Sequence, residues 1–110
     1  MMLNNFNIGN DRLGMQVTLY AVLVITNSEC VLVPKNEDET SSNKIEIFFP
    51  NLECLLDEVV GGWVGSDIHY MDEVIVTGFL DKGTRINISF SISQISNFIL
   101  KRDGDEYKIL

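Results

Sequence analysis

The chain has 110 residues, 45% of them hydrophobic and 22% charged, and its 16 acidic residues outnumber its 8 basic residues for a formal net charge of −8. A chain of this length builds one domain around a single core, and its hydrophobic content excludes an intrinsically disordered protein. The negative charge excludes nucleic acid and anionic membranes as partners, because both are bound chiefly through Lys and Arg. We therefore expect a single domain over residues 1–110, in which residues 1–12 form a ragged end or a short edge strand.

The sequence also bears on where the protein resides. Residues 1–11 contain neither the basic region nor the apolar region of an export signal. The longest apolar stretch, residues 17–25, is far shorter than the ~20 residues that cross a bilayer. Cys30 and Cys54 could form one disulfide, but nothing else in the sequence suggests export. We expect a cytoplasmic protein with two reduced, buried thiols.

The first half of the chain predicts three strands. Residues 13–25 alternate with a period of two, and their second half is apolar on both faces, which indicates a strand that enters the middle of a sheet. A turn at residues 26–29 leads to a short apolar strand at 30–33, which a proline ends. The polar residues 35–43 (KNEDETSSN) predict an exposed loop, and a third strand follows at 45–49.

One short helix is expected near the centre of the chain. It begins after Asn51, whose side chain can cap it by accepting a bond from a free backbone N–H. Apolar residues at i, i+3, i+4 and i+7 form a single stripe along it. These residues are Leu52, Leu55, Leu56 and Val59. The pair Gly61-Gly62 ends the helix. Because so short a helix is marginal alone, it must cover a sheet face or plug one end of a curved sheet.

The second half of the chain predicts mainly strands. Residues 63–72 are irregular or form a short strand. The expected strands span residues 73–80, 84–92, 98–102 and 107–110. Turns are expected at residues 81–83, 93–96 and 103–105. The clearest alternation is that of residues 84–92, in which Ile86, Ile88, Phe90 and Ile92 face inward.

Strands joined by tight turns around a lone helix are typical of the α+β class. The sequence contains no internal repeat and no domain linker. We expect a single, mostly antiparallel sheet of about six or seven strands with one short central helix.

Candidate chemistry is sparse. The only histidine, His69, follows Asp67 by two residues, so both side chains lie on the same side of a strand. A carboxylate in that position can orient the imidazole as a general base, or the two groups can share a metal ion. Cys54 falls in the first turn of the expected helix, but Glu53 and Asp57 disfavour its thiolate. We expect no metal, no cofactor and no enzymatic activity. A small enzyme or ligand-binding domain that uses His69 and Asp67 is the alternative.

The charge is unevenly distributed along the chain. Residues 36–80 hold ten acids against Lys44 alone, a net charge of −9, whereas the rest of the chain holds six acids and seven bases. One interpretation is ordinary charge that keeps the protein soluble. The other is a concentrated acidic surface that steers and matches a basic protein partner. Trp63 and Tyr70 are then aromatic anchors at this surface, or Trp63 instead packs beneath the helix.

Residues 72–80 (DEVIVTGFL) and 95–107 (ISNFILKRDGDEY), roughly a fifth of the chain, carry a family resemblance. With the size and acidity, they resemble the small immunity proteins of bacterial contact-dependent growth inhibition and related polymorphic toxin systems. The resemblance implies a cytoplasmic, non-enzymatic inhibitor that neutralises a toxin, frequently a basic nuclease. It implies no particular binding residues.

We therefore expect the protein to dock an acidic face over a toxin domain, with carboxylates in place of substrate phosphates if the toxin is a nuclease. The expected partner-binding residues are Glu53, Asp57, Glu58, Trp63, Asp67, Tyr70, Asp72 and Glu73. A further alternative is a structural subunit or homodimer that pairs through an exposed edge at residues 73–80.

Overall fold

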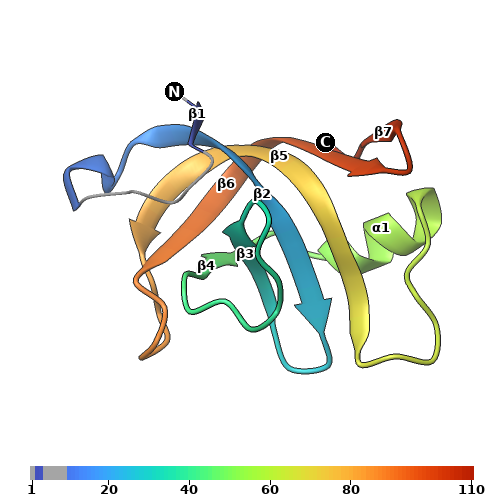
Figure 1. Ribbon diagram of the computed structural model, residues 1–110. Coiled ribbons are helices and arrows are strands. Elements are labelled where there is room, and N and C mark those ends of the chain that lie inside the picture. Colours follow the sequence, from blue (N-terminus) through green and yellow to red (C-terminus); the bar gives the residue numbers. More distant parts are fainter. Residues whose placement is uncertain (1, 4–9) are drawn as a thin grey trace.

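The computed structural model describes residues 2–3 and 10–110 (Figure 1). Its elements are β1 (Met2–Leu3), the 3-10 helix η1 (Asn10–Arg12), β2 (Gln16–Thr26), β3 (Cys30–Pro34), β4 (Ile45–Ile47), α1 (Leu52–Val59), β5 (Ile68–Lys82), β6 (Phe90–Arg102) and β7 (Asp105–Lys108). Within residues 1–12, for which a ragged end or a short edge strand was predicted, β1 pairs with β2 and residues 10–12 form η1. The remaining residues of this segment lie outside the described part of the chain.

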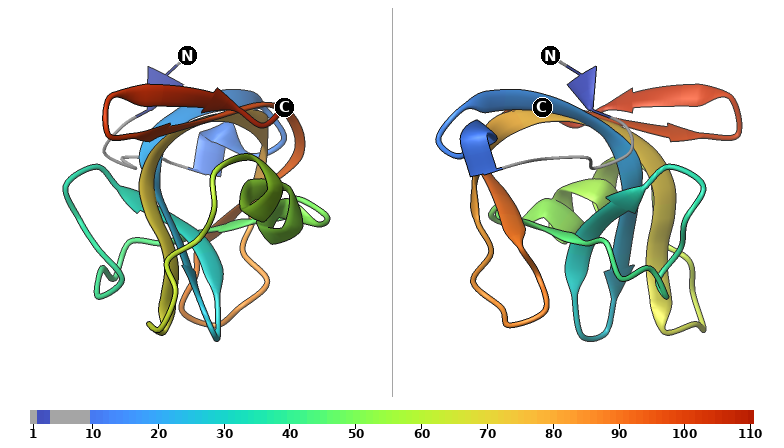
Figure 2. Two further views of the ribbon diagram at one scale, coloured as in Figure 1. Left: turned by 90° about the vertical axis from the view of Figure 1, so that its right-hand side faces the viewer. Right: turned by 60° about the vertical axis from the view of Figure 1, so that its left-hand side comes forward.

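The strands form one seven-stranded sheet that closes on itself. Its order is β1-β2-β3-β4-β6-β5, with β7 on β6, and an additional pairing of β2 with β5 joins the two sides into a five-stranded ring. β1–β2 and β4–β6 are parallel, and the other pairs are antiparallel. Both views of Figure 2 show the strong curvature of the sheet. The prediction of an α+β fold with one mostly antiparallel sheet and one short helix is confirmed.

Strand β2 carries the alternation that the sequence predicts. One set of its side chains, from Val17 to Ile25 at every second position, is buried in the main core. Val22 and Val24, on the opposite face, join Val31 and Val33 of β3 in a second apolar cluster. β2 is therefore buried on both faces along its second half, as expected for a strand in the middle of a sheet.

Helix α1 closes the main core from below the β6–β7 hairpin (Figure 1). Leu52 and Leu56 are buried in that core, but Val59, the last member of the predicted stripe, is 47% exposed. The predicted cap is wrong, because Asn51 takes a left-handed conformation and its side chain makes no capping bond. At the other end the predicted stop is present, because Gly61 takes a left-handed conformation and its N–H donates to the Leu56 carbonyl.

The prediction for residues 84–96 is only partly correct, since residues 90–92 form a strand and Ile88 and Ile92 are buried as expected. Residues 83–89 form a loop, and Ile86, which the alternation places inward, is 99% exposed. The expected turn at 93–96 instead lies inside β6, where the register with β5 shifts and Gln94 takes a left-handed conformation. This β-bulge absorbs the turn-forming residues without ending the strand.

Strand β5 is longer than predicted and lies between two neighbours. It includes residues 68–72, left open as irregular or strand, and residues 81–82, expected in a turn. Residues 73–80 pair with β2 on one side and with β6 on the other. They are therefore not an exposed edge, and the prediction of a homodimer through that edge is wrong.

Candidate functional site

Three acidic residues extend from α1 near the start of β5. The Glu53 carboxylate oxygen Oε2 lies 2.6 Å from Nδ1 of His69. Asp57 Oδ1 accepts a hydrogen bond of 2.6 Å from the Tyr70 hydroxyl. Glu58 is exposed. Two of the three carboxylates therefore fasten the helix to β5.

A chain of hydrogen bonds links α1 to the turn between β2 and β3. Asn27 donates through Nδ2 to Asp67 Oδ1 at 2.9 Å, and its own Oδ1 lies 2.9 Å from Nε2 of His69. His69 Nδ1 faces Glu53 on the other side of the ring. Both ring nitrogens of His69 are therefore within hydrogen-bonding distance of side-chain oxygens.

His69 and Asp67 do not form the pair that the enzyme alternative needs. Each of them binds Asn27 instead, and both nitrogens of His69 are engaged. A general base needs a free imidazole nitrogen that reaches the substrate proton. Within the described residues, no group of three or more His, Cys, Asp or Glu side chains could hold a metal ion.

Two of the expected partner-binding residues are buried. Tyr70 is fully buried, and its pKa is raised by burial and by the hydrogen bond to Asp57. Asp72 is 7% exposed and makes a two-pronged ion pair with Arg102. As a surface anchor and a surface charge, respectively, these two predictions are wrong.

Four of the other expected residues, Glu53, Asp57, Trp63 and Glu73, line two shallow hollows that meet at Trp63, whereas Glu58 and Asp67 line neither. One hollow, of about 400 Å³, is lined by Glu53, Asp57, His69 and residues 61–66. The other, of about 320 Å³, includes Glu73 and also Lys101 and Arg102. Trp63 is 46% exposed and borders both, so it does not pack beneath the helix.

Basic residues offset the acids in the second hollow. Glu73 Oε1 lies 3.7 Å from Lys35 Nζ and accepts a bond from the Tyr20 hydroxyl, and both Lys35 and Lys101 lie over the Tyr20 ring. The predicted acidic field is therefore narrower than the sequence indicates. Among residues 36–80, the acids that form no ion pair with Lys or Arg lie on α1, at Asp67, at Glu46 and at residues 37–39 of the β3–β4 loop.

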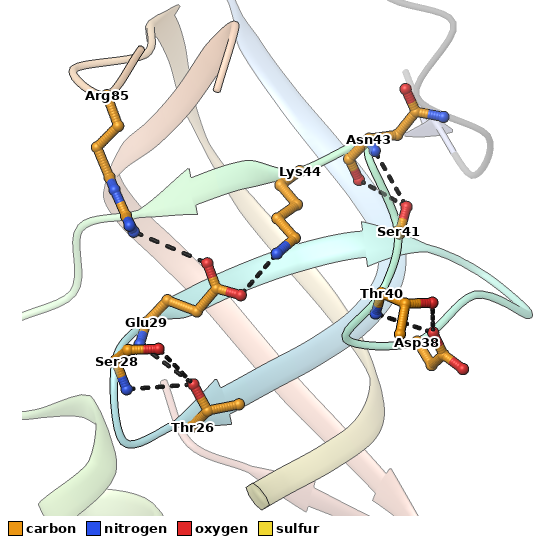
Figure 3. Close-up of polar contacts among 9 residues, drawn as sticks. All are labelled: Thr26, Ser28, Glu29, Asp38, Thr40, Ser41, Asn43, Lys44 and Arg85. Atoms are coloured by element: carbon orange, nitrogen blue, oxygen red, sulfur yellow. Dashed lines mark hydrogen bonds and ion pairs between the residues drawn. The ribbon is translucent and has the colours of Figure 1, made fainter. Parts of the chain in front are cut away.

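A third and larger hollow, of about 530 Å³, which no pattern in the sequence predicted, lies on the side of the sheet that carries the second apolar cluster, since Ile88 of that cluster lines it. Figure 3 shows the Glu29 side chain between those of Lys44 and Arg85. Glu29 lies in the β2–β3 turn, Lys44 lies just before β4, and Arg85 lies in the β5–β6 loop. Sequence spacing cannot bring three loops together. The one available signal was Lys44, the single base within residues 36–80.

The two thiols differ in their surroundings. Cys30 is partly buried, and burial together with the charge of Glu53 raises its pKa to about 12. Cys54 is exposed, contrary to the prediction of two buried thiols. Both are free, and Cys30 is a poor nucleophile at neutral pH because the thiolate is the reactive form.

No protein-family model, no curated protein and no solved structure matches this chain. Among the described residues, no helix has both the length and the apolar character needed to cross a membrane.

Proposed function

We propose that this protein is a non-enzymatic, cytoplasmic inhibitor that binds a basic toxin domain through α1 and the adjoining loop, in the manner of a bacterial immunity protein. The proposed docking surface, called the helix face below, consists of Glu53, Asp57, Glu58, Trp63 and Asp67. Tyr70 and Asp72 support this surface from beneath, and Glu73 lies at its margin.

The observation that carries this proposal is the distribution of ion pairs. Among residues 10–110, Lys and Arg side chains pair with acids elsewhere, and none of these pairs involves an acid of α1. The paired acids are Asp11, Glu29, Asp72, Glu73 and Glu106. His69 alone lies against the helix acids. The helix face therefore keeps most of its negative charge, which favours rapid association with a basic partner.

Apolar side chains beside the acids supply the other requirement of a stable interface. Trp63 is 46% exposed and Val64 is 97% exposed, and both line the hollow below α1. Exposed tryptophans surrounded by polar groups are frequent interface hot spots. A partner side chain that carries a guanidinium could lie against Trp63 while it pairs with Glu53 or Asp57.

If the toxin is a nuclease, the carboxylates of the helix face occupy the place of substrate phosphates. A nuclease binds phosphates with Lys and Arg, and the same side chains pair with carboxylates in a two-pronged geometry. Inhibition then needs no chemistry from this chain, only coverage of the basic site.

The test begins with the tagged protein isolated from its native cell, followed by identification of the bound partner and calorimetry with the purified partner. We expect a domain with a basic surface that arrests growth when expressed alone and not when expressed with this chain. Glu58→Lys and Trp63→Ala should each weaken binding by about tenfold, because an interface charge and an anchor are lost. Asp57 is not substituted in this test, because its carboxylate accepts the hydrogen bond from the buried Tyr70 hydroxyl.

Asp81→Lys, at the far end of β5 from α1, is the matched control, since it changes the net charge by the same amount away from the helix face. It should leave the affinity almost unchanged, and the association rate of the unaltered protein should fall with salt. Equal weakening by Glu58→Lys and Asp81→Lys, or no rescue of growth, would overturn the proposal.

A further inference from the structure

The hollow beside the second apolar cluster, which opens at the β5–β6 loop and is called the mouth site, brings two cations to one carboxylate. Lys44 Nζ lies 2.7 Å from Glu29 Oε1, and Arg85 Nη1 lies 3.8 Å from Glu29 Oε2 (Figure 3). The Glu29 and Lys44 side chains are 14% and 20% exposed, whereas that of Arg85 is 51% exposed. Lys44 is therefore hydrogen-bonded, and Arg85 is held only by a longer ionic contact.

The lining of the mouth site is richer in cations than the chain as a whole. Two of its three charged side chains are cations, in a chain whose net charge is −8, and the further carboxylate of Glu46 at the base of the loop is hydrogen-bonded by Thr84. An ammonium has three hydrogen-bond donors and a guanidinium has five. After their contacts with Glu29, Lys44 and Arg85 still have donors for a second anion.

The remaining lining of the mouth site is mixed in polarity. Ser41, Ser42 and Asn87 contribute polar groups, and Ile86, which is 99% exposed, contributes an apolar side chain at the rim. The volume of about 530 Å³ lies within the range of small-molecule sites. Polynucleotide binding needs a longer run of cations than this single excess charge provides.

The loop that carries Arg85 and Ile86 is fastened at its base. Thr84 donates through its backbone N–H and its hydroxyl to Glu46, a residue of β4 that is 7% exposed. Ile88 is buried against the second apolar cluster. The contacts of Thr84 and Ile88 therefore fix both ends of the loop segment that carries Arg85 and Ile86, which line the hollow.

We propose that the mouth site binds a small organic oxyanion, a carboxylate or phosphate that carries an aromatic or apolar group. The oxyanion pairs with Arg85 and Lys44, and the apolar group lies on Ile86. Glu29 competes with the ligand for both cations. This site does not overlap the helix face, and the inference stands independently of the proposed function.

The test uses phenylacetate and phenyl phosphate, which share a ring and differ in the anion, with phenol as the neutral control. Amide chemical shifts of the labelled protein are followed by NMR as each probe is added at millimolar concentrations. We expect saturable shifts at residues 29, 41–44 and 84–88 for one or both anions and none for phenol. The stronger anion identifies the ligand class.

Variants separate a site from a nonspecific effect of charge. Arg85→Gln and Lys44→Gln should each weaken binding by about tenfold, whereas Glu29→Gln should tighten it several-fold because it removes the competing carboxylate. Lys108→Gln, on β7, is the matched control and should change nothing. Arg85 lies in an exposed loop, so its variant tests binding even if replacement of Glu29 impairs folding. Absence of shifts with both anions, or shifts that survive Arg85→Gln unchanged, would overturn the proposal.

Discussion

Arg102, near the end of β6, holds Asp72 of β5 with two parallel hydrogen bonds, from Nε to Oδ1 at 2.8 Å and from Nη2 to Oδ2 at 2.7 Å. Its Nη1 donates to the backbone carbonyl of Gly61, just after α1. The hydrogen bond to Asp72 raises the pKa of Arg102. One guanidinium thus joins two strands and the end of the helix, and it places the loop that carries Trp63.

Replacement of Asp72 by Asn should destabilise the protein. An amide accepts only one of the two guanidinium bonds and leaves the Arg102 charge without a partner at a largely buried position, which costs about 3 kcal/mol in the free energy of unfolding. Urea denaturation followed by circular dichroism measures the loss. Asp105→Asn, at an exposed position of β7, is the control and should change stability little. Equal stability of the two variants would contradict a structural role for this ion pair.

Tyr70→Phe tests the bond that joins β5 to α1. The Tyr70 hydroxyl is buried and donates to the Asp57 carboxylate, so its removal should lower the free energy of unfolding by about 2 kcal/mol. Tyr20→Phe removes a similar bond, to Glu73, from a partly exposed tyrosine and should cost less than about 1 kcal/mol. Thermal unfolding of the two variants gives the comparison, and a larger loss for Tyr20→Phe would contradict it.

The sequence predicted the framework of the fold because burial repeats along its strands. The period of two in β2 placed its buried residues on the correct faces. The same period explains the errors at Tyr70 and Asp72. They continue the buried alternation of Val74 and Val76 toward the start of β5, so extension of that strand by a few residues would have placed both inside.

The rest could not be predicted because it depends on contacts between distant loops and on a bulge. Residues 84–92 alternate as a strand does, but the bulge at Gln94 lets β6 continue through the expected turn. The cations of the mouth site meet Glu29 only because the ring of strands closes. No periodicity in the sequence encodes that closure.

The two cysteines should react at very different rates. Cys54 is exposed on α1, whereas the raised pKa of Cys30 keeps it as a neutral thiol. An aromatic disulfide reagent at neutral pH should therefore modify one thiol rapidly and the second only on unfolding. Cys54→Ser should abolish the rapid phase. A rapid phase that persists in this variant would show that Cys30 is accessible in the folded protein.

Stability should fall as the pH rises above about 9. The pKa of Cys30 is raised from 9.0 to about 12 in the folded protein, so below pH 9 the thiol is protonated in both states and its contribution is complete. Between these values the unfolded chain loses the proton and the folded chain keeps it, which lowers the free energy of unfolding by up to about 1.4 kcal/mol per pH unit. Tyr70, whose pKa is also raised, acts in the same direction at higher pH. Urea titrations of Cys30→Ala should give a shallower slope above pH 9, and an unchanged slope would contradict this account.

Gly78→Ala should disrupt the bulge that lets β6 curve across β5. A methyl group at this position would lie 2.6 Å from the backbone oxygen of Ser93 and 2.9 Å from Cδ1 of Ile95. Because a backbone oxygen cannot move away as the end of a flexible side chain can, the two strands must separate, at a cost of about 2 kcal/mol or more in the free energy of unfolding. Ser93→Ala keeps that backbone and removes only a hydroxyl, so it should cost far less. Urea denaturation compares the two variants, and similar stability of both would mean that the strands accommodate a side chain at Gly78 and that the bulge does not depend on glycine.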